Sequence, residues 1–228
     1  MGTNDRAKNE QPAHQVNLDS YYIDQYEVTF AWFAEFLNVV GNQFEGNAHW
    51  IEANDVDLHI HLVCDIWQVD EGYSEYPMNE VTWFGARAFC EWRGARLPTE
   101  AEWEKAARGT DERTYPWGEE ITCDMANFAG CNYKAVPVAS FPEHLSPYGA
   151  FNMAGNMMEW VADWYSADYY ANSTADNPTG PESGDFRVFS GGSYINAPGN
   201  VRTTYRFPKL PVLTYVTTGF RCAREVLP

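Results

Sequence analysis

The chain contains 228 residues, of which 45% are hydrophobic and 16% aromatic, so one domain can bury a sizeable core. Its net charge of −17 argues against binding to nucleic-acid phosphates, which needs clustered Lys and Arg, and against docking on an anionic membrane. No apolar run reaches the roughly 20 residues of a membrane-spanning helix, and the first residues contain no apolar segment of the signal-peptide type. We therefore expect a soluble protein that neither binds nucleic acid nor inserts into a membrane.

The beginning of the chain predicts a strand followed by a helix. Residues 1–15 are polar, so we expect a flexible N-terminal arm before a single domain that spans residues 16–228. Alternating and aromatic residues predict one bent strand or two short strands over residues 16–26. Thr29 is in position to cap a helix with a stripe of apolar residues, and Gly41 is the residue that ends it.

Two further helices are predicted in the middle of the chain. The apolar residues between positions 42 and 76 follow no sustained period, which fits an ordered loop that contains a hairpin. Residues 81–94 form an amphipathic pattern with apolar side chains on one face. Thr99 and Glu102 make a capping box for the next helix, which ends at Gly109. The rest of the chain is rich in Gly, Pro and Asn, which indicates turns and short strands.

Five cysteines are too few for a disulfide scaffold, and their number is odd. Cys123 and Cys131 flank a short loop and could pair. Cys90 and Cys222 lie in apolar contexts, which predicts buried thiols.

Motifs for metal binding or acid–base catalysis are weak. His59 and His61 alternate along an expected strand with no third ligand nearby, which favours a structural pair over a metal site. Acid pairs such as Glu119 and Glu120 lie in apparent loops, where solvated charge is the better interpretation. The chain contains no nucleophile elbow, phosphate loop or CxxC-type zinc motif.

Several segments together resemble one protein family. They are RLPTEAEWEKAARG, YPWG, SPYGAFNMAGNMMEWVADWY, RVFSGGS and GFRCAR, which follow one another through nearly the whole chain. These segments resemble the formylglycine-generating-enzyme, or sulfatase-modifying factor, domain. The resemblance implies an α+β, C-type-lectin-like fold with two helices, small mixed sheets and much ordered loop.

The enzymes of this family that are best known oxidise a substrate cysteine to formylglycine with copper held by two cysteine thiolates. A two-coordinate Cu(I) site needs thiolates, which amide and aliphatic side chains cannot replace. Along the family pattern, Asn196 and Val201 stand where the two thiolates would be, and Cys222 is expected to be a core residue. Copper is therefore not expected, and no cofactor is required. A second branch uses iron, whose histidine ligands come partly from an additional helical domain that we do not find here.

A third branch of the family is non-enzymatic and consists of variable ligand-binding proteins that a retroelement diversifies near the C-terminus. Ser193, Arg202 and Arg206 fit the fixed part of this pattern, as does the Gly-Phe-Arg sequence that follows Thr218. The residues among them show no period of two or 3.6 that would bury one face, which favours an exposed surface. From Ser193 to Thr218, only Lys209 lies outside the set of residues that diversified Asn codons can encode.

The resemblance and the residue pattern together predict a variable ligand-binding surface over residues 194–218. Tyrosine and apolar side chains on a rigid scaffold make good binding anchors, as in antibody loops. The candidate ligand-binding residues are Tyr194, Ile195, Asn196, Ala197, Gly199, Asn200, Val201, Thr203, Thr204, Tyr205, Phe207, Leu210, Val212, Leu213, Tyr215 and Val216.

One motif is a candidate for structural calcium. Asn156 and Glu159 match a family motif that helps to hold this ion, and their oxygens are of the type that Ca²⁺ prefers. The alternative is that Glu159 is the buried partner of an arginine. Buried arginines need carboxylates, so we expect Arg96, Arg202 and Arg221 to pair with acids among Glu100, Glu102, Glu159 and Asp163.

The sequence thus predicts a non-enzymatic ligand-binding protein of the receptor-recognition type. Its partner would be an unidentified protein, such as a cell-surface receptor, and its location a virion or a cell surface. The alternatives are an oxidase or sulfatase-modifying enzyme of the same family, and a catalytically inactive paralogue of that enzyme.

Overall fold

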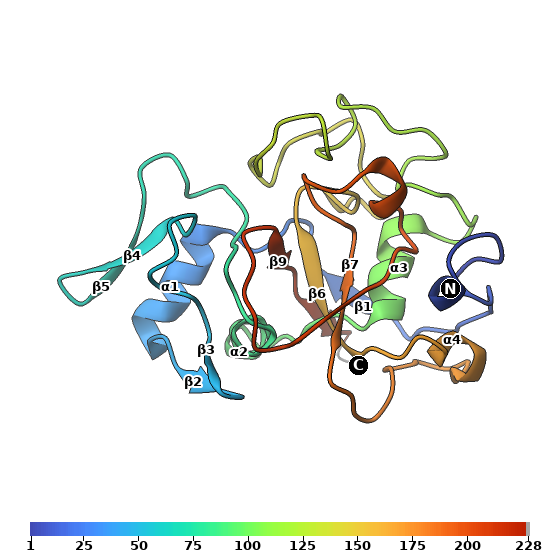
Figure 1. Cartoon of the computed structure of the whole chain (residues 1–228), viewed down its shortest axis with the longest axis horizontal. Helices are drawn as coiled ribbons and strands as arrows, with labels where there is room; N and C mark the ends of the chain where they lie inside the picture. Colours follow the sequence, from blue (N-terminus) through green and yellow to red (C-terminus); the bar gives the residue numbers. More distant parts are fainter. Residues whose placement is uncertain (227–228) are drawn as a thin grey trace.

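A four-stranded mixed sheet lies at the centre of the computed structural model, which describes residues 1–226 (Figure 1). Its strands are β6 (Met158–Trp164), β7 (Arg187–Ser190), β8 (Phe207–Lys209) and β9 (Thr218–Phe220), in the order β8-β7-β6-β9. Strand β6 runs antiparallel to β7 and parallel to β9. The C-terminal part of the chain therefore supplies both edge strands.

The longer helices begin and end where local sequence signals place them. They are α1 (Phe30–Val40), α2 (Trp83–Trp92) and α3 (Glu100–Arg108), and the shorter helical turns are η1 (Lys8–Glu10), α4 (Tyr169–Asn172) and η2 (Pro198–Asn200). Thr29 caps α1, and Thr99 with Glu102 forms the predicted capping box of α3. Residues 1–226 thus contain one long helix more than the two that the resemblance implied.

Three pairs of short strands complete the fold. Strand β1 (Tyr21–Ile23) pairs with β10 (Ala223–Glu225), β2 (Phe44–Glu45) with β3 (Ala48–His49), and β4 (Ile60–Val63) with β5 (Ile66–Val69), all antiparallel. The hairpin predicted between residues 42 and 76 is confirmed twice, by β2–β3 and by β4–β5. Together with the central sheet, these pairs confirm an α+β fold with small mixed sheets.

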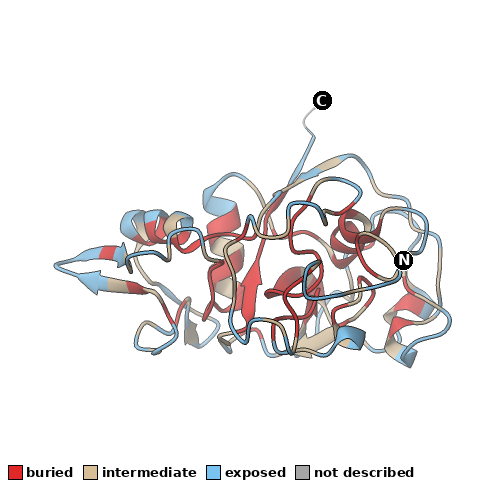
Figure 2. Ribbon diagram, turned by 90° about the horizontal axis from the view of Figure 1, so that it is seen from above, coloured by how far each residue is buried: buried red, intermediate tan, exposed pale blue. Residues whose placement is uncertain are grey.

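Aromatic rings between α1, α2 and the sheet form most of the core. Phe33 stacks on Phe89 with ring centroids 5.5 Å apart, and both meet Phe220 of β9 edge-on. On the opposite face of the sheet, Trp103 of α3 packs with Val188 of β7. Each fully buried Phe contributes about 1.5–3 kcal/mol, so these layers fix the sheet between the helices. Figure 2 shows the buried residues concentrated there.

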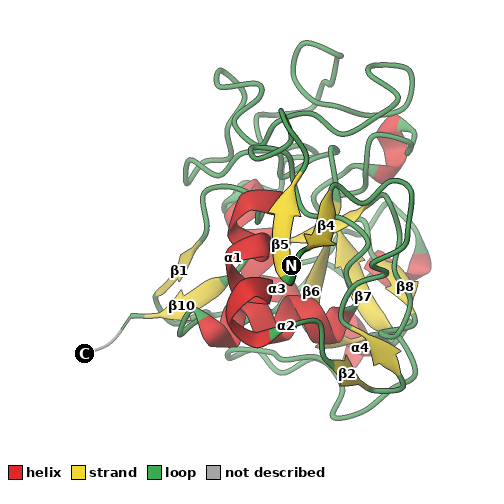
Figure 3. Cartoon of the chain, turned by 90° about the vertical axis from the view of Figure 1, so that its left-hand side faces the viewer, coloured by secondary structure: helices red, strands yellow, loops and turns green. Residues whose placement is uncertain are grey.

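Loops without regular structure occupy much of the remaining chain, as predicted. Figure 3 shows them gathered beyond one end of the helices and strands. The longest lies between α3 and β6, and in Figure 1 it runs along the upper edge of the molecule. Among residues 1–226, no helix is long and apolar enough to cross a membrane.

The prediction of a flexible arm over residues 1–15 is wrong, because this segment packs against α3 and the C-terminal part of the chain. Gly2 is buried, with φ of +77°, and its N–H donates to Glu104 of α3 at 2.9 Å. Glu10 is 1% exposed and pairs with Arg202 at 2.6 Å. The polar composition suggested exposure to solvent, but the Gly2 N–H and the Glu10 carboxylate have partners 102 and 192 positions away.

The structure contains two disulfides. Cys123 and Cys131 are bonded, which is the pairing that the sequence left open. The prediction of buried thiols for Cys90 and Cys222 is wrong, because these residues are also bonded, with Cα atoms 5.5 Å apart. Their separation of 132 positions hides the contact from the sequence, whereas the fold brings α2 next to the last strands. Cys64 is free and exposed.

Candidate functional site

The C-terminal stretch, residues 191–224, begins with two glycines that no other residue could replace without strain. Gly191 and Gly192 have φ of +86° and +65°, in the left-handed region. A Cβ at Gly192 would lie 2.3 Å from the Asn200 carbonyl oxygen, and one at Gly191 would lie 2.9 Å from the Trp103 ring. The glycines therefore allow the chain to turn sharply out of β7.

A hydrogen-bonded turn follows the glycines. Ser193 donates its N–H and its hydroxyl to Asn196 Oδ1, both at 2.8 Å, and the Asn196 N–H donates to the Ser193 carbonyl at 2.9 Å. Next along the chain, the Tyr115 hydroxyl donates to the Pro198 carbonyl in η2 at 3.1 Å. These bonds hold the backbone, so the side chains that project from it are presented on a rigid support.

Two buried ion pairs then anchor the middle of the stretch. Arg206 pairs with Glu100 at the start of α3, with distances of 2.5 and 2.8 Å to the two carboxylate oxygens. Arg202 pairs with Glu10, which also accepts from the Thr204 hydroxyl at 2.6 Å. The sequence led us to expect an acid near α3 or β6 for Arg202, and Glu10 was missed because its segment was assigned to a flexible arm.

The sixteen candidate ligand-binding residues differ in exposure. Exposed are Ile195, Ala197, Gly199, Leu210 and Leu213, and partly exposed are Asn196, Asn200, Tyr205, Phe207, Val212, Tyr215 and Val216. Buried are Tyr194, Val201, Thr203 and Thr204. The structure contradicts a direct role in ligand contact for these four, because protein atoms cover their side chains.

Contacts with distant segments of the chain bury three of these residues. Val201 is fully buried in a small cluster with Tyr115 and Phe128. The Thr203 hydroxyl donates to backbone carbonyls of the loop after α3, and Thr204 is tied to Glu10. No period in the sequence distinguishes these positions from their exposed neighbours, because the stretch is an irregular loop.

The second half of the stretch carries aromatic rings that are buried on one side and open on the other. Phe207 and Tyr215 pack against the main core, and each keeps part of its ring accessible. The Lys209 ammonium lies 4.1 Å from the centre of the Tyr215 ring and 5.1 Å from that of Phe207. These rings are therefore both structural and accessible, so their removal would also cost stability.

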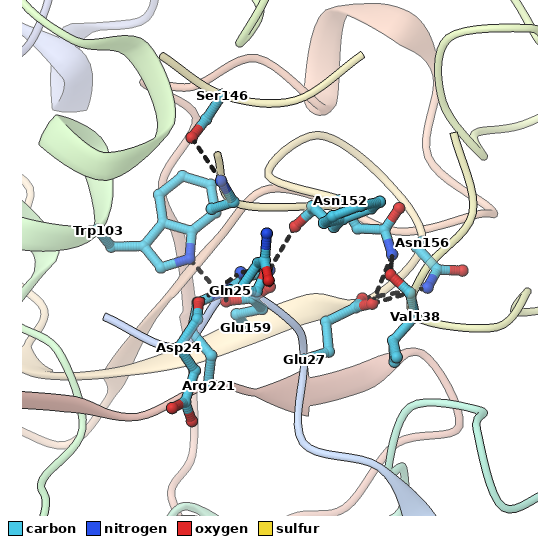
Figure 4. A network of polar contacts seen from close by, with 12 residues as sticks. Asp24, Gln25, Glu27, Trp103, Val138, Ser146, Asn152, Asn156, Glu159 and Arg221 are labelled. Atoms are coloured by element: carbon cyan, nitrogen blue, oxygen red, sulfur yellow. Dashed lines mark hydrogen bonds and ion pairs between the residues drawn. The ribbon is translucent and has the colours of Figure 1, made fainter. Parts of the chain in front are cut away.

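Beneath the stretch lies a buried polar network centred on Glu159 (Figure 4). Arg221 donates to both oxygens of Glu159, at 2.6 and 2.7 Å, and the Trp103 indole N–H donates at 2.8 Å. The alternative role predicted for Glu159, as partner of a buried arginine, is confirmed. Arg96 likewise pairs with Glu102, as expected.

Glu27 is a buried acid that the sequence did not single out. Its carboxylate accepts from the amide groups of Asn152 and Asn156 at 2.8 to 3.2 Å (Figure 4). Burial, with a further contribution from the neighbouring Glu159, raises the pKa of Glu27 to about 8. Asn156 Oδ1 accepts from the Val136 N–H at 2.9 Å. The oxygens of Asn156 and Glu159 are thus engaged within the protein, an arrangement that does not fit a calcium site of six or more oxygens.

Comparison with known proteins places this geometry in a family. The model of the sulfatase-modifying factor enzyme 1-like domain matches residues 1–226. The chain belongs to this family. The formylglycine-generating enzyme of Mus musculus is 34% identical, covering 100% of this chain and 73% of the mouse protein. The serine/threonine-protein kinase Pkn1 of Chlamydia trachomatis is 38% identical, covering 99% of this chain. The chain spans only 36% of that relative's length.

Solved structures of the same fold agree with this assignment. PvdO from Pseudomonas aeruginosa superposes with a TM-score of 0.80 and 25% identity, covering 99% of this chain and 90% of PvdO. Treponema denticola variable protein 1 superposes with a TM-score of 0.77 and 24% identity, covering 99% of this chain and 91% of that protein. Together with the family match, they confirm the C-type-lectin-like fold.

The two positions at which the family pattern leads us to expect the thiolate pair, Asn196 and Val201, carry side chains that do not fit copper. Asn196 closes the turn through its hydrogen bonds with Ser193, and Val201 is fully buried. Cys222, the nearest cysteine in the sequence, is bonded to Cys90. Amide and aliphatic groups cannot take the place of thiolates for Cu(I).

Proposed function

We propose that this domain is a non-enzymatic ligand-binding protein. Its binding surface, here called the C-terminal surface, consists of the accessible candidate residues Ile195, Asn196, Ala197, Gly199, Asn200, Tyr205, Phe207, Leu210, Val212, Leu213, Tyr215 and Val216. The carrying observation is that apolar side chains project from a fixed backbone: Ile195 is 58% exposed, Leu213 42% and Leu210 39%. Exposed apolar groups on a rigid support indicate a site of association.

A protein is the partner that such a surface suits best. Rigid apolar and tyrosine anchors among small polar groups are typical of paratopes, which bind other proteins with little loss of side-chain entropy. The net charge of −17 remains unfavourable for nucleic acid. A receptor on a cell, contacted from a virion or from another cell surface, is the partner type that we propose.

The family relationship favours a second candidate, an oxidase related to the formylglycine-generating enzymes, because the mouse enzyme is 34% identical. Oxygen uptake during copper titration with a cysteine-containing peptide tests this activity directly. Turnover would contradict the binding proposal. The residues at the thiolate positions, Asn196 and Val201, lead us to expect none.

The binding proposal is tested by selecting peptides on the folded protein from a phage-displayed random library. Binding of the selected peptides should weaken at least about tenfold in Leu213→Asp, because a charge would interrupt the apolar contact. Leu62→Asp is the matched control, since Leu62 is 55% exposed in the β4–β5 hairpin, outside the C-terminal surface. If the affinity for the peptides falls equally in both variants, or falls in neither, the proposed surface is contradicted.

A further inference from the structure

Two positively charged residues occupy neighbouring positions in the central sheet, and neither forms an ion pair within residues 1–226. Arg187 of β7 and Lys209 of β8 stand directly opposite in the antiparallel register, so their side chains share one face. None of the ion pairs formed within residues 1–226 includes either residue. Like charges in this position destabilise a sheet, so their placement calls for an explanation.

The arrangement contrasts with that of the other arginines of this region. Arg202, Arg206 and Arg221 each have a carboxylate at 2.6 Å or less, so their charges are neutralised inside the protein. The chain has 32 acidic and 15 basic residues, so carboxylates are plentiful. Neither Arg187 nor Lys209 takes part in one of the ion pairs of the described chain, although the more distant Asp163 favours the charge of Arg187. Lys209 lies on the edge strand β8, and Arg187 lies on the inner strand β7.

Aromatic rings orient both cations. The Arg187 guanidinium lies between Trp83 and Trp164, 3.7 and 3.4 Å from the ring centres, and donates to the Ala162 carbonyl. Its Nε atom is buried and has no hydrogen-bond partner. Stacking of this kind fixes the direction of the guanidinium. Burial lowers the pKa of Arg187 to about 10, so the half-buried group still carries a positive charge at neutral pH.

Lys209 connects this pair of cations to the C-terminal surface. Its ammonium lies over the rings of Tyr215 and Phe207, two residues of that surface. Lys209 and both rings are partly exposed, so an incoming side chain can reach the ammonium beside an apolar wall. Such a wall displaces water and strengthens an ion pair with the ligand.

We propose that Lys209 is the centre of a carboxylate-binding subsite of the C-terminal surface, with the positive charge of Arg187 on the neighbouring strand behind it. The partner protein then presents an Asp or Glu side chain next to apolar residues that contact Phe207, Leu210 and Tyr215. This inference rests on the proposed function and adds the chemistry of the partner. A purely protective role of Lys209, as a charge that blocks pairing at the edge strand β8, requires no preference for acidic ligands.

The charge of the whole protein makes the test selective. A net charge of −17 attracts basic peptides and repels acidic ones over most of the surface. We expect peptides selected on the wild-type protein to be enriched in Asp and Glu relative to the unselected library. Their affinity, measured by calorimetry, should fall at least about fivefold in Lys209→Gln and should weaken with added salt.

Lys105→Gln is the matched control. Lys105 also lies over a tyrosine ring, 5.5 Å from the centre of Tyr148, and it likewise takes part in no ion pair of the described chain. This substitution removes the same charge from α3, so the affinity of the selected peptides should stay within about twofold of wild type.

The outcomes separate this inference from the proposed function. The carboxylate subsite alone would be overturned by peptides whose affinity falls in Leu213→Asp but which are not enriched in Asp and Glu. It would also be overturned if such peptides bound Lys209→Gln as tightly as wild type. Peptides whose affinity does not change in Leu213→Asp would contradict the C-terminal surface itself. A selection that yields no binding peptide would contradict it as well. Loss of affinity in Lys209→Gln but not in Lys105→Gln is the supporting result.

Discussion

Arg221 holds the sheet under the C-terminal surface, and its replacement gives the sharpest prediction about this scaffold. Its side chain and that of Glu159 are both completely buried, with 0% exposure. The guanidinium also donates to the carbonyls of Asp24, Gln25 and Phe151 at 2.8 to 3.2 Å. Arg221→Met would leave the buried Glu159 carboxylate with the Trp103 indole N–H but without its cation, and breaking a buried ion pair in this way costs about 3–5 kcal/mol.

The three carbonyls would also lose their donor, at roughly 1–3 kcal/mol for each group that water does not reach. The sum is comparable with the whole free energy of unfolding of a domain, about 5–15 kcal/mol, so we expect a variant that is barely folded. Arg221→Met combined with Glu159→Gln should recover part of the loss, because the uncompensated charge is removed.

Urea unfolding followed by tryptophan fluorescence measures these free energies. Arg93→Met is the control, since Arg93 forms a partly exposed ion pair with Asp24 and its loss should cost less than about 1 kcal/mol. A cost below about 1 kcal/mol for Arg221→Met, or a double variant less stable than the single one, would refute the assignment of Glu159 to a charged, buried pair.

Three further predictions concern the scaffold. Burial raises the pKa of Glu27 from its ordinary 4.5 to about 8, so stability should fall as the pH rises from about 5 to 8; thermal unfolding of Glu27→Gln should lack this slope. Gly192→Ala should cost at least about 2 kcal/mol in urea, and clearly more than Gly130→Ala, which has positive φ but open space around its Cβ position. Replacing Cys90 and Cys222 by Ala should lower the free energy of unfolding by about 2–4 kcal/mol. If the free energy of unfolding of the wild-type protein is the same with and without a reductant, the bond between these cysteines is contradicted.

The sequence alone determined the elements whose causes are local. Thr29 and the Thr99–Glu102 capping box set the starts of α1 and α3, because a cap satisfies backbone N–H groups only three or so residues away. The motifs around Gly191 and Arg221 also pointed to the family, and hence to the fold. The sequence could suggest the pairing of Cys123 with Cys131 because only eight positions separate them.

Only the tertiary structure decided which side chains of the C-terminal stretch face solvent. Val201 and Thr204 are buried while Ile195 and Leu213 are exposed, because the loop after α3 and the N-terminal segment cover one side of an irregular backbone. The pairing of Arg202 with Glu10 spans 192 positions and leaves no periodic trace in the sequence. Contacts between distant segments depend on how the whole chain packs, and local patterns carry no information about them.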